Sequence, residues 1–355
     1  MPEAHGMHEM HKVHGTGAVH ETREAAAVHD TREPGTREPD PCVIALDVGG
    51  TGMKGALLDR DLRPLATLRR PTPRDAGPDA VVDAIAATLE LLSRRAGEQG
   101  VTVLRAGVVV PGIVDEERAR AVFSANLGWR DLPMRALLEQ RCGLPVTLGH
   151  DVRACGSAEA ELGAARGARD VLFVAIGTGI AAAVISDGRP VRAGGHAGEL
   201  GHLVVEPDGA PCGCGARGCL ETVASAAAVA GAFTARSGRS VDGADQVAAL
   251  LALGDPNAEA VWRRATEALA DALAIATTLL APELIVLGGG LAEAGELLLT
   301  PVRAALAERL TFQRQPAVVR AALGDEAGCL GAGLHAWHAL TDATLPRELT
   351  GGATR

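Results

Sequence analysis

The chain has 355 residues, of which 47% are apolar, and its formal net charge is −10. This length is enough for two ordinary domains, and the acidic balance argues against a nucleic-acid-binding surface as the main feature. Because the sequence has no run of 18 apolar residues and its first residues are too polar for a signal peptide, we expect a soluble cytoplasmic protein with no membrane partner.

The first 41 residues differ in composition from the rest of the chain. Histidine recurs at positions 5, 8, 11 and 14, and the charged tract TREPGTREPDP follows without apolar periodicity. Such a segment cannot bury enough apolar surface to offset the entropy of ordering it. We expect a disordered His-rich tail over residues 1–41, whose histidines either have no function or capture metal adventitiously. It offers no pair of amphipathic helices for a DNA-binding helix-turn-helix.

A strand, a glycine-rich turn and a second strand are predicted directly after this tail. In VIALDVGGTGMKGALLD, apolar residues flank the glycines on both sides, whereas Walker A and dinucleotide-binding loops place a helix after them. The turn at Gly49 and Gly50 can present backbone N–H groups to an anion, with Thr51 and Lys54 as further donors and Asp47 available to hydrated Mg²⁺. A glycine hairpin without any ligand is the alternative interpretation.

Helices and strands then alternate. Apolar residues at helical spacing predict a helix over residues 79–100, and LRAGVVVPGIVD predicts a strand that is broken at Pro111 and Gly112. SANLGWRDLPMRALLEQRCG predicts a loop that leads into a helix. PVTLGHDVRACGSAEAELGAAR predicts a short strand that passes through His150 and Asp151 into an Ala-rich helix. An Asp at a helix start is commonly an N-cap, which is one interpretation of Asp151.

The pattern of residues 43–64 returns at residues 170–191. DVLFVAIGTGIAAAVISDGRPV is again an apolar run, a glycine turn and a second apolar run. Two copies of one supersecondary unit predict a duplicated α/β architecture with two similar lobes and a cleft between them. Each lobe then offers one glycine turn to the cleft, and the second turn consists of Gly177, Thr178 and Gly179.

The last third of the chain is predicted to be mainly helical, with helices over residues 222–281 and a final helix over residues 328–340. Between them, ELIVLGGGLAEAGELLLTPVRAAL predicts a strand, a turn at Gly288, Gly289 and Gly290, and a helix. Glycines directly before a helix let a phosphate or a nucleoside approach the backbone closely.

The stretch ELGHLVVEPDGAPCGCGARGCLE, residues 199–221, has the composition of a metal site. It holds His202 and three of the seven cysteines, Cys212, Cys214 and Cys219, in the order His-x9-Cys-x-Cys-x4-Cys. Three thiolates and an imidazole form a tetrahedral ligand set for Zn²⁺, and the intervening glycines let a short loop fold around the ion. We therefore predict a closed structural zinc site. The remaining cysteines are expected to be buried small hydrophobic residues outside any disulfide framework: Cys42, Cys142, Cys155 and Cys329.

Together these motifs resemble the ROK (repressor, open reading frame, kinase) family of sugar kinases and regulators. DVGGTGMK, PG followed by SANLGW, HD at a helix start, GTG and ELGH-x9-CGCGARGCLE carry the resemblance, which extends from about Cys42 to Leu340. The family has an α/β, actin-like, hexokinase-type fold of two lobes, and its enzymes transfer the γ-phosphoryl group of ATP to a sugar hydroxyl, usually the 6-hydroxyl of a hexose. We expect a small lobe over residues 42–150, a large lobe with the zinc loop over residues 151–341, and a tail over residues 342–355. The C-terminal helix is expected to pack back on the small lobe.

The resemblance implies a role for each motif. Asp151 becomes the general base that accepts the proton of the sugar hydroxyl, for which a modest base is adequate because phosphoryl transfer depends mainly on positioning and charge stabilisation. His202 either binds zinc alone or also donates its second ring N–H to the sugar. Sugar contacts are assigned to Gly112, Asn126, His150, Glu199, His202 and Glu221. Nucleotide contacts are assigned to Asp47 on the Mg²⁺ side, Gly49, Gly50, Thr51, Lys54, Gly177, Thr178, Gly179, Gly288, Gly289 and Gly290. Glu206 has no assigned role and is expected to be a solvated loop residue.

One residue departs from the family pattern. Family kinases commonly have Asn before the catalytic Asp, whereas this chain has His150, and a neutral imidazole cannot do both jobs of an amide at once. The resemblance favours an ATP-dependent hexose kinase, foremost a glucokinase, with an N-acetylhexosamine kinase or a fructokinase as the nearest alternative. A sugar-responsive transcriptional regulator and a non-catalytic sugar sensor are further alternatives. The donor is either ATP or polyphosphate, and similar kinases are homodimers or homotetramers.

Overall fold

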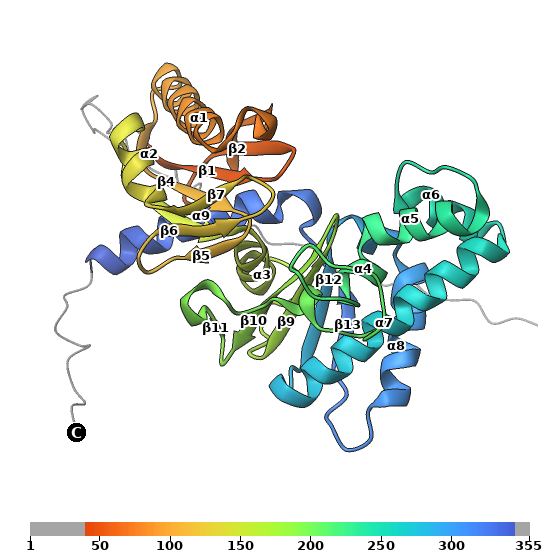
Figure 1. Ribbon diagram of the computed structural model, residues 1–355. Helices are drawn as coiled ribbons and strands as arrows, with labels where there is room; N and C mark the ends of the chain where they lie inside the picture. Colours follow the sequence, from red (N-terminus) through yellow and green to blue (C-terminus); the bar gives the residue numbers. More distant parts are fainter. Residues whose placement is uncertain (1–39, 345–355) are drawn as a thin grey trace, which may run out of the picture. The chain divides into compact units, whose positions relative to one another are not determined.

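The computed structural model describes residues 40–344, all of which belong to one compact unit (Figure 1). The strands are β1 (Pro41–Val48), β2 (Gly52–Leu58), β3 (Pro64–Pro71), β4 (Thr102–Val110), β5 (Ile113–Asp115), β6 (Arg120–Ser124), β7 (Trp129–Leu132), β8 (Val146–His150), β9 (Val171–Ile176), β10 (Ile180–Ser186), β11 (Arg189–Pro190), β12 (Leu284–Gly288) and β13 (Ala317–Arg320). The α-helices are α1 (Pro78–Glu98), α2 (Met134–Cys142), α3 (Asp151–Glu161), α4 (Glu221–Ala224), α5 (Ala226–Ser237), α6 (Ala244–Ala252), α7 (Pro256–Leu280), α8 (Glu296–Arg309) and α9 (Ala327–Thr344). Single 3₁₀ turns are η1 (Arg74–Ala76), η2 (Ala193–Gly195), η3 (Leu200–His202), η4 (Gly290–Ala294) and η5 (Gly324–Glu326).

Both predicted tails lie outside the described residues except at their inner ends. Pro41, placed in the N-terminal tail by its composition, already pairs with Thr102 as the first residue of β1, and α9 continues to Thr344. Within residues 40–344, none of the helices is both long and apolar enough to cross a bilayer.

Two five-stranded sheets repeat the same topology. The first has the strand order β3-β2-β1-β4-β8, and the second has the order β11-β10-β9-β12-β13. In each sheet the central strand pairs antiparallel with its hairpin partner and parallel with a later strand: β1 with β2 and β4, and β9 with β10 and β12. The predicted duplication is therefore present, with one glycine turn in each copy.

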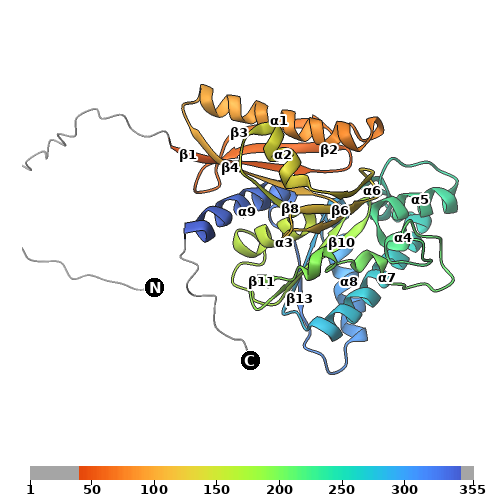
Figure 2. The ribbon, with the colours of Figure 1, turned by 60° about the vertical axis from the view of Figure 1, so that its left-hand side comes forward.

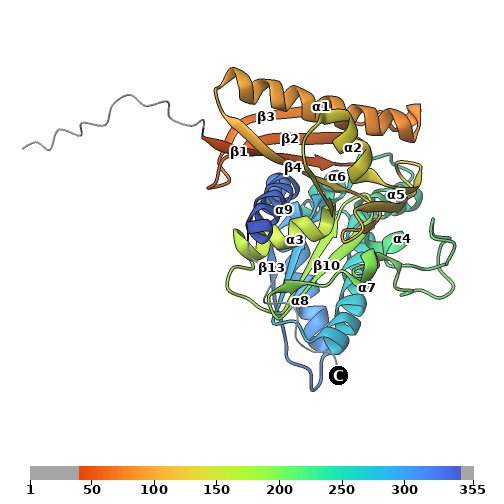
Figure 3. The same cartoon turned by 90° about the vertical axis from the view of Figure 1, so that its left-hand side faces the viewer.

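The first sheet is covered on both faces, which explains why β1 reads as a continuous apolar run. Successive residues of a strand point to opposite faces. Ile44 accordingly packs in the core shared with α1 and α2, whereas its neighbour Val43 packs in the core shared with α9. Figures 2 and 3 show α1 and α2 on one side of this sheet and α9 on the other.

The second sheet is also covered on both faces. Its larger core lies against helices α5 to α8, and its other face packs against α3. The helix α3 follows the last strand of the first sheet, and α9 follows the last strand of the second, so each helix packs on the sheet of the other lobe. The two helices also contact each other, because the carbonyl oxygen of Ala154 lies directly over Gly331.

Two loop predictions need correction. The SANLGW segment is the turn of a hairpin, in which β6 and β7 pair antiparallel within a small sheet of order β5-β6-β7. Its strands are only four or five residues long, which is too short for a clear alternating pattern. The triple glycine leads into η4 and not directly into an α-helix, since α8 begins only at Glu296. The predicted order of strand, glycine turn and helix is present, but the glycines do not directly precede the helix.

Candidate active site

The junction of β8 and α3 holds the predicted base. The N-cap of α3 is His150, whose Nδ1 accepts the backbone N–H of Arg153 at 3.2 Å. Asp151 is the first residue inside the helix, so its interpretation as the N-cap is wrong. Its Oδ1 accepts the backbone N–H of Val152 at 2.7 Å, and burial raises the pKa of its carboxyl to about 6. Burial and then the charge of Arg153 lower the pKa of His150 to about 4, so the imidazole is neutral at pH 7.

A second carboxylate lies close to Asp151. Asp47 is near the C-terminal end of β1, and burial followed by the negative charge of Asp151 raises its pKa to about 7, while Lys54 opposes the shift. A carboxylate whose pKa is raised by burial and by a neighbouring carboxylate is stabilised in its charged form by a nearby cation. Oxygen ligands of this kind suit Mg²⁺.

A row of charged residues crosses the first sheet next to Asp47. Asp47 pairs in register with Lys54, and Lys54 pairs with Arg69 of β3. Asp325 of η5 contacts both cations, forming a short ion pair with Lys54 and a 2.7 Å bond with Arg69 Nη2. A cavity of about 570 Å³ opens above this row, and basic side chains with exposed backbone N–H groups suit a phosphate chain there. The cavity is lined by Asp47, Gly49, Thr51, Gly52, Met53, Lys54, Arg69, Arg70 and Pro71.

The first glycine turn forms one wall of this cavity. Thr72, just beyond β3, holds the turn in place, donating its Oγ1–H to Gly49 O at 2.7 Å and its backbone N–H to Thr51 O at 3.1 Å. A Cβ atom on Gly50 would lie 3.9 Å from the Cβ of Asn126. The structure thus brings the predicted sugar residue Asn126, in the β6–β7 turn, next to the predicted phosphate turn.

The second glycine turn, between β9 and β10, lies beside Glu221. Gly177 donates its backbone N–H to Gly179 O at 2.9 Å, and Thr178 at the tip is exposed. The Glu221 carboxylate accepts the backbone N–H of Ile180 at 2.9 Å and occupies the space where a Gly179 side chain would lie. This carboxylate, predicted to contact the sugar, therefore also fixes the second turn.

The third glycine turn lies against the second. Gly289 has φ +81° and its Cβ would lie 2.5 Å from Ile176 O, so the backbone there requires glycine. Gly288 packs on the Phe173 ring, and Gly290 opens η4 with free space around its Cα. Gly112, between β4 and β5, also has a backbone that requires glycine, because its φ is +101° and a Cβ would lie 2.2 Å from Phe123 O.

The predicted zinc ligands converge. One ligand atom from each of His202, Cys212, Cys214 and Cys219 lies within 4.8 Å of all the others. The Sγ atoms of Cys214 and Cys219 are 3.7 Å apart, and His202 Nδ1 is 3.7 Å from Cys212 Sγ. Zn–S bonds of about 2.3 Å in a tetrahedron separate neighbouring sulfurs by roughly 3.8 Å, so the donor set fits Zn²⁺. His202 Nε2 points the other way and lies 3.9 Å from Glu199 Oε2.

Sequence reasoning missed a buried ion pair behind the base. Glu116 Oε1 accepts Arg153 Nε at 2.9 Å and the backbone N–H of His150 at 3.2 Å, and its Oε2 accepts Arg192 Nε at 2.6 Å. The Arg153 side chain is 2% exposed and that of Glu116 is 9% exposed. Burial alone would raise the pKa of Glu116, but the Arg153 charge and hydrogen bond outweigh it and hold this pKa below its usual value.

Glu206 is not simply a solvated loop residue. Its carboxylate forms a two-pronged ion pair with the guanidinium of Arg264 on α7, at 2.7 and 2.5 Å. The pair connects the zinc loop to the large helix of the second lobe.

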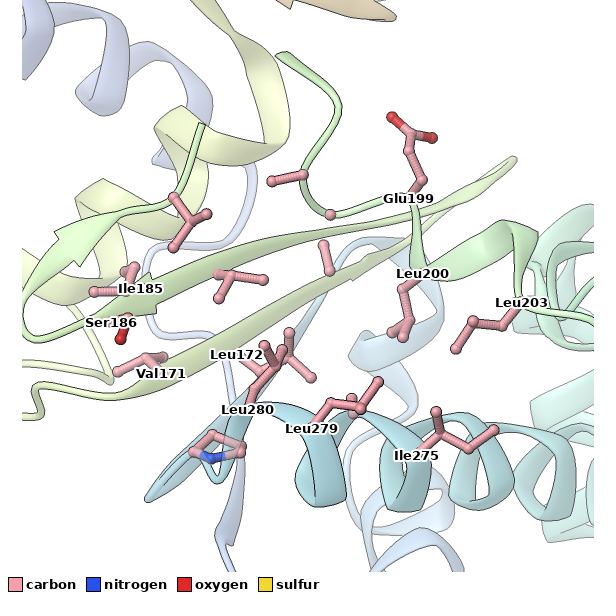
Figure 4. Close-up of a pocket in the computed structure, with 17 residues that line it drawn as sticks. Val171, Leu172, Ile185, Ser186, Glu199, Leu200, Leu203, Ile275, Leu279 and Leu280 are labelled. Carbon is pink, nitrogen blue, oxygen red and sulfur yellow. The ribbon is translucent and has the colours of Figure 1, made fainter. Parts of the chain in front are cut away.

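A second cavity, of about 510 Å³, is lined by Glu199 and by residues of β9, β10 and α7 (Figure 4). Its lining is apolar, including Ile275, Leu279 and Leu280 of α7. Glu199 is the one ionisable residue among the lining residues, and its carboxylate points away from these side chains. With no cationic side chain in its walls, this cavity does not suit a phosphate.

Comparisons with known proteins agree with this geometry. A sequence model of the ROK family matches residues 43–338. The glucokinase of Streptomyces coelicolor is 32% identical over 313 residues, which cover 81% of this chain and 95% of that protein. The N-acetylmannosamine kinase of Citrobacter koseri is 34% identical over 302 residues, which cover 82% of this chain and 97% of that protein.

A solved structure extends the similarity to three dimensions. The ROK family glucokinase from Streptomyces griseus, in complex with glucose and AMPPNP, has a TM-score of 0.74 and 33% sequence identity. The superposition covers 84% of this chain and 99% of that one. The similarity therefore includes both five-stranded sheets.

Proposed function

The chain belongs to the ROK family and has its α/β, actin-like sugar kinase fold, and we propose that it transfers the γ-phosphoryl group of ATP to the 6-hydroxyl of a hexose, foremost glucose. The observation that carries this proposal is the juxtaposition of Asp151 with Asp47 and the basic cavity of the first lobe. A base for the acceptor hydroxyl thus lies beside a site for the donor phosphates.

Asp151 acts as the general base. With a pKa near 6, its carboxylate is ionised at neutral pH yet basic enough to accept the hydroxyl proton as the O–P bond forms. The glycine turn and Lys54 hold the donor phosphates, and Arg69 adds a further positive charge. Mg²⁺ brought with ATP would be held on the side of Asp47, where it neutralises charge on the phosphates.

The sugar lies against the wall formed by Glu199, His202 and Glu221. If Nδ1 of His202 binds the metal, the proton of the ring is on Nε2. This Nε2–H donates a hydrogen bond to a sugar hydroxyl, with Glu199 as a neighbouring acceptor. Asn126 supplies an amide from the opposite lobe. Gly112 contributes backbone contact at the turn after β4, where a Cβ would lie 2.2 Å from Phe123 O.

The zinc site has a structural role in this proposal. The four convergent donors support Zn²⁺, which would fix the loop that connects His202 to Glu221. ATP and reduced thiolates are both cytoplasmic, which supports a cytoplasmic location.

A second candidate is phosphorylation of an N-acetylated hexosamine. The sequence identity to the N-acetylmannosamine kinase, 34%, is close to the 32% identity to the glucokinase. In addition, His150 stands where the family commonly has Asn, and one altered contact can redirect selectivity.

A coupled ADP-release assay tests both candidates. The purified chain is incubated with MgATP and, in turn, glucose, mannose, fructose, N-acetylglucosamine and N-acetylmannosamine, and the phosphorylated carbon is located by ³¹P NMR. We expect turnover with at least one hexose, and with glucose first. Asp151→Asn is the matched control, which keeps the shape of the site and is expected to lower turnover about 10²-fold or more. No sugar phosphate in the ³¹P NMR spectrum for any sugar, with either ATP or polyphosphate as donor, would overturn the kinase proposal.

A further inference from the structure

His150 makes its contacts within the protein, although it occupies the position of a sugar-binding residue. Its side chain is 7% exposed. Because Nδ1 accepts the backbone N–H of Arg153, the proton of the neutral ring is on Nε2. Nε2 faces Oδ1 of Asp151 at 3.5 Å. Nδ1 is therefore bound by the helix backbone, and Nε2 lies next to the carboxylate of Asp151.

The same contacts distinguish the two oxygens of Asp151. Oδ1 receives the backbone N–H of Val152 at 2.7 Å and faces the Nε2–H of His150. Among the residues that the structure describes, Oδ2 has no hydrogen-bond partner. Catalytic hydrogen bonds are often long without substrate and shorten in the reactive complex. A donor on Oδ1 leaves Oδ2 free to accept a hydrogen bond from a ligand.

The imidazole is itself held from behind by the buried Glu116–Arg153 pair. Glu116 accepts the backbone N–H of His150, and Arg153 also donates to Val114 O at 3.0 Å and to Gly195 O at 3.3 Å. The pair thus connects the β8–α3 junction with β5 and with η2, the turn that precedes Glu199. Because these groups are buried, the ring has little freedom to turn toward a ligand.

We propose that His150 is a positioning residue for Asp151: its Nε2–H holds Oδ1, so that Oδ2 is presented to the sugar hydroxyl, and the Glu116–Arg153 pair keeps the ring in that orientation. The inference rests on the proposed kinase function. The family's Asn suggests that residue 150 contacts the sugar, whereas in this proposal His150 contacts Asp151 instead. If His150 positions Asp151, replacing His150 lowers kcat, whereas replacing a residue that only contacts the sugar mainly raises the KM for the sugar.

Two substitutions test the roles of the two ring nitrogens of His150 separately. His150→Asn keeps an acceptor in the place of Nδ1 and restores the family's amide, but it lacks the donor at Nε2. His150→Gln retains a donor near Nε2 and loses the cap. We expect His150→Asn to lower kcat on the order of tenfold to a hundredfold with the sugar KM within about twofold, and His150→Gln to recover part of kcat. His338→Asn, an exposed histidine on α9, is the control with unchanged kinetics. Full turnover in His150→Asn, or a loss confined to the sugar KM, would overturn the proposal.

A second measurement does not depend on turnover. In protein labelled with ¹⁵N-histidine, the resonance that is lost in His150→Asn identifies His150. We expect the neutral Nε2–H tautomer, and a shift of this N–H resonance in Asp151→Asn but not in Asp187→Asn, a control at an exposed site. A proton on Nδ1, or no response to Asp151→Asn, would refute the contact. If no sugar is phosphorylated, the kinase proposal fails, but this spectrum still decides whether His150 holds Asp151.

Discussion

Asp151 gains its basicity from its surroundings. Its carboxyl is partly buried at the start of α3, near a second carboxyl on β1, and the loss of solvation disfavours the ionised form of both. The backbone N–H of Val152 and the charge of Arg153 partly offset this effect. The resulting pKa, about 6, lies close enough to neutral pH for the carboxylate to be both present and basic.

We expect a pH profile with an acid limb near this value. Because proton acceptance requires the carboxylate, kcat/KM for the sugar should fall about tenfold per pH unit below pH 6 and reach a plateau above pH 7. The measurement uses saturating MgATP at each pH, so that protonation of ATP does not limit the rate. Circular dichroism at each pH serves as the control for unfolding. A flat profile from pH 5 to pH 7.5 would contradict the assignment of Asp151 as the base.

For single residues, the sequence predicts those positions that a local motif determines. The order His150-Asp151 predicted a strand that passes into a helix at this point, and the structure ends β8 at His150 and begins α3 at Asp151. Glu116 was not predicted, because it meets Arg153 only through tertiary contact across 37 positions. One signal was available: Arg153 is the only basic residue in α3, amid mostly small residues, and a charge on a buried helix needs a partner.

The zinc loop is held by two different kinds of contact. The four convergent donors would hold the proposed Zn²⁺, and the Glu206–Arg264 pair fastens the loop to α7. Metal binding and loop folding are coupled, because the ligands converge only in the folded loop. The ion pair is partly exposed and contributes little, typically less than about 1 kcal/mol.

Loss of the metal should therefore weaken sugar binding. We expect Cys214→Ser, or treatment of the wild type with a strong chelator, to raise the sugar Kd about tenfold or more, since the His202 ring loses its anchor. Calorimetric titration with the hexose and zinc analysis by atomic absorption measure the two quantities together. Glu206→Gln is the matched control, which changes the loop without removing a ligand. Unchanged sugar affinity in zinc-free protein would mean that the loop is only a scaffold.

The hairpin β1–β2 and the strand β3 create a charge row that no single motif contains. Asp47, Lys54 and Arg69 lie opposite one another only because of the strand register. The glycine turn was predictable from its sequence. The position of Arg69 opposite Lys54 was not, since strand register is fixed by packing and by the turn. Asp325 reaches the row from the other lobe, because the buried Glu159 of α3 accepts two backbone N–H groups of the preceding loop.

Asp325 competes with phosphate for the same two cations. We expect Asp325→Asn to lower the KM for MgATP about two- to fivefold, because Lys54 and Arg69 lose an anion that the phosphates must displace. The measurement is a titration of MgATP at saturating sugar. Glu326→Gln, which removes a weaker contact of Arg69 at 3.4 Å, should change this KM less. A higher KM in Asp325→Asn would instead indicate that Asp325 orients Lys54 toward the nucleotide.

The two lobes are joined by an exchange of helices. The helix α3 leaves the first sheet and packs on the second, whereas α9 does the reverse, and the two cross in van der Waals contact. Small residues make this approach possible. A Cβ on Gly107 would lie 1.9 Å from Ala332 O, and one on Gly331 would lie 2.3 Å from Ala154 O. The duplication was predictable from two similar strand–turn–strand segments, but this crossing was not, because small residues are also ordinary in Ala-rich helices.

Gly331→Ala should therefore destabilise the molecule as a whole. A methyl group that meets a backbone oxygen at 2.3 Å forces α3 and α9 apart, which we expect to lower the free energy of unfolding by about 1–3 kcal/mol. Turnover should fall as well, because α9 also carries Gly328, where an added Cβ would lie 2.4 Å from Asp47 Oδ2. The matched control is Gly231→Ala in α5, where no atom lies within 4 Å of the added methyl group. Helix propensity alone predicts a gain of up to about 1 kcal/mol there. Thermal unfolding of both variants measures the difference, and a Gly331→Ala protein as stable as Gly231→Ala would show that the helix crossing does not hold the lobes together.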